Sequence, residues 1–135
     1  MKSEEILAVS AAVIQGGCVL LVRRGRAPAR GLYAFPGGRM EAGETPEQAI
    51  ARELLEETGL VMTSATPYRD LVLHGDVDQQ IFRLNVFRAT VSPGTVMAGD
   101  DASEAGWYSP EEIATMSLTD STRTIVEELR HSPGG

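Results

Sequence analysis

Alternating apolar and polar residues predict strands in the middle of the chain. Within residues 80–91, Phe82, Leu84 and Val86 alternate with polar side chains. This two-residue period is typical of a strand that has one face more exposed than the other. A further strand is expected over residues 68–74, and the two together suit a sheet.

Two continuous apolar runs lie near the N-terminus, over residues 6–14 and 18–23, on either side of a Gln-Gly-Gly break at 15–17. Such runs predict strands that are buried on both faces, and the break predicts a hairpin between them. The first run is too short to span a bilayer and lacks a signal-peptide cleavage pattern. We therefore expect no membrane partner.

A helix is predicted after Thr45, because this residue suits the N-cap, Pro46 suits the first helical position and Gln48 completes a capping box. Gly59 supplies the C-terminal stop. The residues that should pack on the sheet are Ile50, Ala51, Leu54 and Leu55. The residues that should face an open site are Glu53, Glu56 and Glu57.

The three glutamates occupy neighbouring rows of the predicted helix, so their charges repel unless a cation or a basic partner sits among them. Oxygen ligands of this kind suit Mg²⁺. The preceding loop, residues 35–38, contains Gly37 and Gly38 and can bring bare backbone close to a ligand. A divalent-cation site is therefore expected here.

Helical signals return near the C-terminus. Ser109 followed by proline predicts the start of a short helix, and Thr119 precedes a longer helix with apolar residues at helical spacing. Residues 132–135 are expected to fray. The order of elements predicts an α+β fold, and the length favours a single domain over residues 1–135.

The composition limits the kinds of molecule that the protein is expected to bind. Nineteen acidic residues against twelve basic ones give a net charge of −7, which disfavours nonspecific binding of nucleic acid through a basic surface. The single cysteine, Cys18, cannot form a disulfide within the chain and reads as a small buried residue. We expect a cytoplasmic protein. Zinc is not expected, because neither histidine has a His or Cys at metal-ligand spacing.

The acidic helix alone could be a capped surface helix with solvated glutamates. However, residues 38–60 carry the pattern G-x5-E-x7-R-E-U-x-E-E-x-G-U, where U is aliphatic. Its seven fixed identities would match by chance on the order of once in 10^8 starting positions. The pattern is the signature of the Nudix hydrolases, and this sequence resembles that family without a mismatch.

The resemblance implies a Nudix fold, an α/β/α sandwich around a mixed sheet. It also implies Mg²⁺-dependent hydrolysis of a nucleoside diphosphate linked to another group, with Mn²⁺ able to substitute. By the same resemblance, Glu56 and Glu57 are the main metal ligands, and Glu53 is a further ligand or the catalytic base. A backbone carbonyl of Gly37 or Gly38 completes the metal shell.

The resemblance assigns Glu44 and Arg52 to a supporting ion pair that holds the catalytic glutamates in place. The loop over residues 99–104 looks like the family segment that can bring an extra acidic group to the metal. Asp101 is then a candidate ligand and Glu104 an alternative base, although an acidic run in such a loop also fits ordinary turn chemistry.

Basic residues cluster after the second apolar run, as Arg23, Arg24, Arg26 and Arg30. Arginine forks suit phosphate oxygens, so Arg23 and Arg24 are candidate substrate ligands, with a solvated loop as the alternative. Arg39 is open to the same two interpretations. Phe35 could stack on a base or belong to the core.

Several substrates remain open. The G-D-D-A-x-E-x-x-W arrangement ending at Trp107 resembles family members labelled ADP-ribose pyrophosphatase-like, which favours ADP-ribose or a nucleotide sugar. The alternative within the enzyme class is a nucleoside triphosphate, including an oxidised one, cleaved to release pyrophosphate. A catalytically silent nucleotide sensor is a further alternative. The resemblance also implies that two copies could pair as a homodimer.

Overall fold

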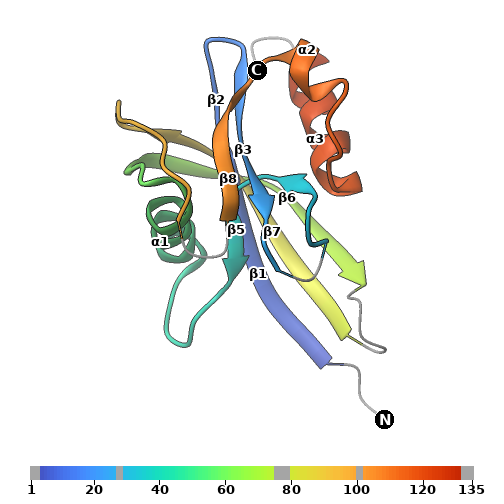
Figure 1. Cartoon of the computed structure of the whole chain (residues 1–135). Coiled ribbons are helices and arrows are strands. Elements are labelled where there is room, and N and C mark those ends of the chain that lie inside the picture. Colours follow the sequence, from blue (N-terminus) through green and yellow to red (C-terminus); the bar gives the residue numbers. More distant parts are fainter. Residues whose placement is uncertain (1–3, 27–28, 75–79, 100–101, 132–135) are drawn as a thin grey trace.

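The computed structural model describes residues 4–26, 29–74, 80–99 and 102–131. The strands are β1 (Glu4–Ala12), β2 (Ile14–Gln15), β3 (Cys18–Arg24), β4 (Tyr33–Ala34), β5 (Gly37–Arg39), β6 (Met62–His74), β7 (Gln80–Val91) and β8 (Ala102–Tyr108). The helices are α1 (Pro46–Thr58), α2 (Pro110–Ile113) and α3 (Asp120–His131). Figure 1 shows α1 on one side of the strands and α2 with α3 on the other.

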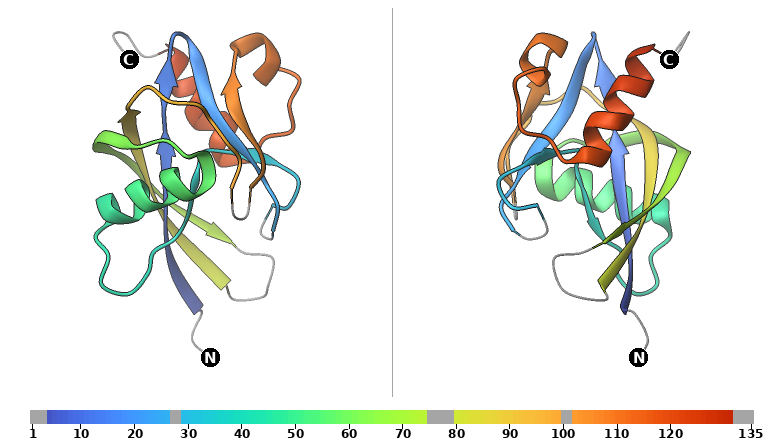
Figure 2. Two further views of the ribbon diagram at one scale, coloured as in Figure 1. Left: turned by 60° about the vertical axis from the view of Figure 1, so that its left-hand side comes forward. Right: turned by 90° about the vertical axis from the view of Figure 1, so that its right-hand side faces the viewer.

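The strands form two sheets. The first has the order β5-β1-β7-β6, in which β1 runs parallel to β7 and the other pairs are antiparallel. The second is centred on β3, which pairs with β2, β4 and β8. Both views in Figure 2 show helices on opposite sides of these strands. The predicted α+β class, with a mixed sheet between helical layers, is confirmed.

Hydrophobic side chains pack on both faces of β1. Val9 and Ala11 join the cluster that contains Leu54 of α1, whereas Ala12 joins the cluster that contains Ile125 of α3. Successive residues of a strand point to opposite faces, so one uninterrupted apolar run serves both cores. The prediction that this run is buried on both faces is correct for residues 8–13.

Helix α1 begins and ends as its sequence predicts. Thr45 is the N-cap of a complete capping box, and Gly59 ends the helix with a left-handed φ of 75°. The predicted faces need one correction. Leu55, which was expected to pack on the sheet, is 55% exposed, because the helix is rotated so that Glu57 points toward the backbone of Gly37.

The prediction that residues 6–14 and 18–23 pair as one hairpin is wrong for most of the first run. The apolar run breaks at Val13: β1 pairs with β5 and β7, and only the two residues of β2 pair with β3. The chain thus passes from one sheet to the other at this point. Val13 is already bonded to the second sheet, because the Leu20 N–H of β3 donates to its carbonyl across 3.0 Å.

The strand predicted over residues 80–91 is confirmed as β7, whereas β6 begins at Met62, six residues before the predicted start. In the part of the chain that the structure describes, no helix has the length and apolar character needed to cross a membrane.

Candidate functional site

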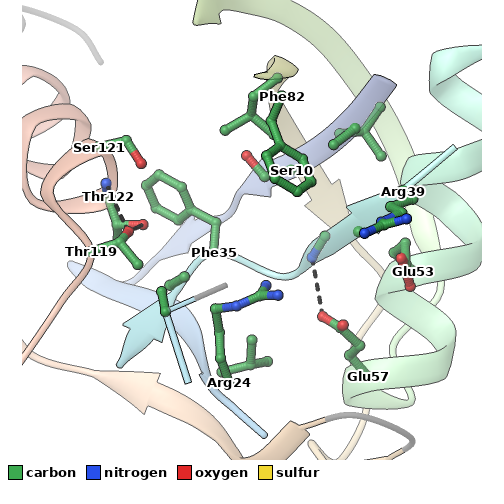
Figure 3. Close-up of a pocket in the computed structure, with 18 of the residues that line it drawn as sticks. Ser10, Arg24, Phe35, Arg39, Glu53, Glu57, Phe82, Thr119, Ser121 and Thr122 are labelled. Carbon is green, nitrogen blue, oxygen red and sulfur yellow. Dashed lines mark hydrogen bonds between the residues drawn. The ribbon is translucent and has the colours of Figure 1, made fainter. Parts of the chain in front are cut away.

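A cavity of about 800 Å³ lies beside the short glycine-containing strand β5. One end is lined by the glutamates of α1, and the other by β1, β7 and the start of α3. Figure 3 shows these two ends on either side of the segment that carries Phe35 and β5. We call them the carboxylate end and the ring end.

The carboxylate end contains Glu53, Glu56 and Glu57, which all line the cavity from α1. Glu57 is the most buried of them, and its Oε1 accepts a hydrogen bond from the Gly37 N–H at 3.1 Å (Figure 3). The caps set where α1 begins and ends. The bond to Gly37 holds Glu57 against the neighbouring strand.

The two glycines of β5 are needed for space. A Cβ on Gly38 would overlap the Glu53 carboxylate, and a Cβ on Gly37 would overlap the backbone of Val9 and Ser10. Only bare backbone can pass between β1 and the helix at this distance. The glycines therefore bring bare backbone close to β1 and α1, and the expected approach to a ligand stays a prediction.

Arg52 pairs with several carboxylates at this end. Its Nε lies 2.6 Å from Glu44 Oε2, and its Nη1 lies 3.1 Å from Glu56 Oε1 and 3.5 Å from Glu53 Oε1. The predicted ion pair of Glu44 with Arg52 is present. Hydrogen bonding from Arg52 lowers the pKa of Glu44 to about 2, and the same contact raises the pKa of Arg52.

The three glutamates of α1 have different partners within the protein. Among the described residues, no three His, Cys, Asp or Glu side chains converge in a way that could hold a metal ion as they are placed. Glu53 and Glu56 both lie within reach of Arg52, whereas Glu57 is bound to Gly37. A shared cation would compete with Arg52 for the first two carboxylates.

The structure separates the candidate arginines. Arg24 and Arg39 line the cavity, as does Arg26, and Figure 3 shows Arg24 between Phe35 and Glu57. Arg23 does not line the cavity. The pairing of β3 with β8 shifts register between Arg23 and Arg24, and the Arg23 side chain lies beside Glu104 of β8 instead.

Glu104 also lies away from the cavity lining. It is paired across β3 and β8 with Arg23, at 3.7 Å between Nη1 and Oε1, and it accepts a hydrogen bond of 2.7 Å from the Tyr33 hydroxyl. This bond and burial raise the pKa of Tyr33 to about 12. The structure therefore pairs Arg23 and Glu104 with each other and does not bring them to the cavity with the other candidates. Asp101 lies outside the described residues.

The ring end is lined by aromatic, aliphatic and hydroxyl side chains. Phe35 and Phe82 are 4% and 8% exposed, and the Arg39 guanidinium lies 5.7 Å from the centre of the Phe82 ring. The other lining residues here include Ser10, Leu84, Val86, Thr119, Ser121 and Thr122. Of all these, sequence reasoning proposed only Phe35 and Arg39 for the site. The sequence pattern places Phe82 in a strand, and a lone serine in an apolar run carries no functional signal.

Residues 5–129 match the family model described as the NUDIX domain. The chain belongs to the Nudix family. A relative named ADP-ribose pyrophosphatase, from Methanocaldococcus jannaschii, is 33% identical over 135 residues, which cover 95% of this chain and 75% of the relative. A Mycobacterium tuberculosis relative named putative 8-oxo-dGTP diphosphatase 2 is 38% identical over 134 residues, covering 96% and 91%.

A solved structure also resembles this Nudix protein closely. The crystal structure of a MutT NUDIX hydrolase from Burkholderia pseudomallei superimposes with a TM-score of 0.83 at 26% identity, and the match covers 93% of this chain and 98% of the other. The predicted family and fold are thus confirmed. In this Nudix protein, the characteristic box of residues 38–60 forms β5 and α1, which together make the carboxylate end of the cavity.

Proposed function

We propose that this Nudix hydrolase is a Mg²⁺-dependent pyrophosphohydrolase that cleaves the diphosphate of a nucleoside diphosphate linked to another group, with ADP-ribose or a nucleotide sugar as the favoured substrate. One observation carries the proposal. The carboxylates of α1, the bare backbone of β5 and two arginines, Arg24 and Arg39, border one cavity that continues into an aromatic chamber. That arrangement matches an anionic phosphate chain attached to a planar base.

The donor set suits a hard divalent cation. Carboxylate oxygens of Glu53, Glu56 and Glu57 and backbone carbonyls of β5 are the ligand types that Mg²⁺ and Mn²⁺ prefer. Glu56 and Glu57 would hold the ion, with Glu53 or a carbonyl of Gly37 or Gly38 completing the set. When bound, such an ion neutralises the phosphate oxygens and lowers the pKa of attacking water.

The chain's own residues supply the other functions. Arg24 and Arg39 would bind phosphate oxygens with their guanidinium forks. Glu53 would accept the proton from the water whose oxygen attacks phosphorus, while the bridging oxygen leaves with the second phosphate. Arg52, fixed by Glu44, would keep the carboxylates of α1 oriented toward the cavity.

A second candidate is hydrolysis of a nucleoside triphosphate, including an oxidised one, to a monophosphate and pyrophosphate. The observation that favours it is the relative named putative 8-oxo-dGTP diphosphatase 2, whose match covers 96% of this chain. The favoured reading has its own support in the relative named ADP-ribose pyrophosphatase. The carboxylate end would act in the same way in both reactions, and the products differ.

Product analysis separates the two candidates. Purified protein with Mg²⁺ would be incubated with ADP-ribose, nucleotide sugars, dinucleotides and normal and oxidised nucleoside triphosphates, and the products identified by mass spectrometry. The favoured function predicts a nucleoside monophosphate and a sugar phosphate. The second predicts pyrophosphate. Tight nucleotide binding with no turnover of any substrate would contradict both and support a catalytically silent sensor.

A further inference from the structure

One polar group at the ring end has no partner. Among the described residues, the Ser10 Oγ is the buried side-chain nitrogen or oxygen atom that makes no hydrogen bond. Ser10 is only 7% exposed and lines the cavity from the centre of β1. Figure 3 shows its hydroxyl directed into the space between the Phe35 and Phe82 rings.

Packing alone does not explain a serine at this position. Ser10 lies on the same face of β1 as Ala8 and Ala12, both of which are buried. An alanine would fill the same place without leaving a hydroxyl group unsatisfied. Since buried polar groups are nearly always hydrogen-bonded, an orphaned one calls for a functional explanation.

The surroundings of Ser10 indicate the kind of partner it lacks. Two aromatic rings flank the hydroxyl, and the hydroxyl side chains of Thr119 and Thr122 at the start of α3 line the same chamber (Figure 3). Aromatic side chains stack on planar rings, and a hydroxyl can either donate or accept a hydrogen bond. A heteroaromatic ring with a polar edge meets both requirements.

We propose that Ser10 determines base specificity: a nucleobase enters between Phe35 and Phe82 and takes the Ser10 hydroxyl as a hydrogen-bond partner. The inference rests on the proposed function and adds the residue that reads the base. The hydroxyl is shielded from solvent in the free protein, so the two rings must part as the base enters.

The burial of the hydroxyl gives the bond its selectivity. An ordinary protein–ligand hydrogen bond replaces bonds to water on both partners and gains little, whereas the Ser10 hydroxyl is already shielded from solvent. A base that presents a polar atom at this point gives up its own bond to water and satisfies the buried hydroxyl in exchange. A base that presents a C–H group leaves the hydroxyl as unsatisfied as before and gains nothing.

The test is nucleotide binding by the full chain without metal. AMP, GMP, CMP and UMP would each be titrated by calorimetry in the presence of a chelator, into wild type, Ser10→Ala and Ser103→Ala. Ser103 is an exposed serine on β8 and is the matched control. Affinity of Ser10→Ala for the preferred nucleotide should fall about 10- to 100-fold, and the preference among the four bases should shrink with it.

Thermal unfolding of the same variants excludes a structural role. Ser10→Ala removes an unsatisfied hydroxyl, so its Tm should equal or exceed that of wild type. Unchanged base preference in Ser10→Ala would overturn the inference, as would a lower Tm with an equal loss of affinity for every base. If wild type hydrolyses a substrate of the panel but Ser10→Ala keeps its nucleotide affinity and base preference, the inference is wrong and the proposed function stands. If wild type neither binds nor hydrolyses any nucleotide, both fall together.

Discussion

The two ends of the cavity differ in how far they are organised before a ligand arrives. At the carboxylate end, Arg52 is within ion-pair distance of Glu44, Glu53 and Glu56, and Glu57 is bound to Gly37. At the ring end, Ser10 has a buried hydroxyl with no partner. The comparison indicates that the protein itself positions the charged groups of the carboxylate end, whereas it leaves a polar group of the ring end without a partner.

The largest effect is expected at the most buried carboxylate. Glu57→Gln keeps the shape of the side chain but removes the charge, so activity should fall about 100-fold or more, since even the outer partners of metal ligands contribute 10- to 100-fold. Steady-state hydrolysis with Mg²⁺ measures this. Glu127→Gln, an exposed position on α3, is the control and should behave as wild type. Equal activity in both variants would remove Glu57 from the site.

Substituting the glycines of β5 should separate catalysis from folding. In Gly38→Ala the new methyl group meets the flexible end of Glu53, which can move aside, whereas in Gly37→Ala it meets the backbone of β1. Gly38→Ala should therefore remain folded and lose about 10- to 100-fold in activity. Gly37→Ala should lower Tm as well.

Thermal unfolding and hydrolysis would be measured on both glycine variants. Gly106→Ala is the control, because its added methyl group would make only ordinary contacts with Tyr108. An active Gly38→Ala enzyme would show that Glu53 need not occupy its position against β5.

The ion pair of Glu44 with Arg52 should show in the pH dependence of stability. The pKa of Glu44 is lowered from 4.5 to about 2, so its contribution is complete above pH 4.5 and is lost as the pH falls toward 2. The difference in unfolding free energy between wild type and Glu44→Gln should therefore close over that window. Denaturant unfolding at a series of pH values measures it. A constant difference down to pH 2 would contradict the assignment.

The smallest effect on activity is expected outside the cavity. Glu104→Gln should leave hydrolysis within about twofold of wild type, because exposed ion pairs contribute little. It should nevertheless lower the pKa of Tyr33 from about 12 toward 10, since the bond to Glu104 is the main cause of that shift. Ultraviolet titration of tyrosinate, with Tyr33→Phe to identify the signal, measures this. A large loss of activity would restore Glu104 as the base.

The carboxylate end could be predicted from the sequence because its parts are close together in the chain. A capping box, a glycine stop and three glutamates at helical spacing define α1 locally. The rotation of α1 could not be predicted, because it depends on the bond from Gly37 to Glu57 rather than on the helix itself. The sequence pattern therefore places Leu55 against the sheet, whereas the structure leaves it exposed.

The ring end could not be predicted because its residues come from distant segments. Ser10, Phe35 and Phe82 meet only once β1, β5 and β7 have paired. Strand β8 was also missed, since its polar residues resembled an acidic loop. The sequence also did not distinguish Arg24, which lines the cavity, from Arg23, which does not.

The central claim is that the glutamates of α1 hold a divalent cation at the carboxylate end. Titration with Mn²⁺, followed by electron paramagnetic resonance, tests it most directly on wild type, Glu56→Gln, Glu57→Gln and the control Glu127→Gln. The account predicts that wild type and Glu127→Gln bind Mn²⁺, and that both α1 variants bind it at least about tenfold more weakly. Equal Mn²⁺ affinity in all four proteins would contradict it.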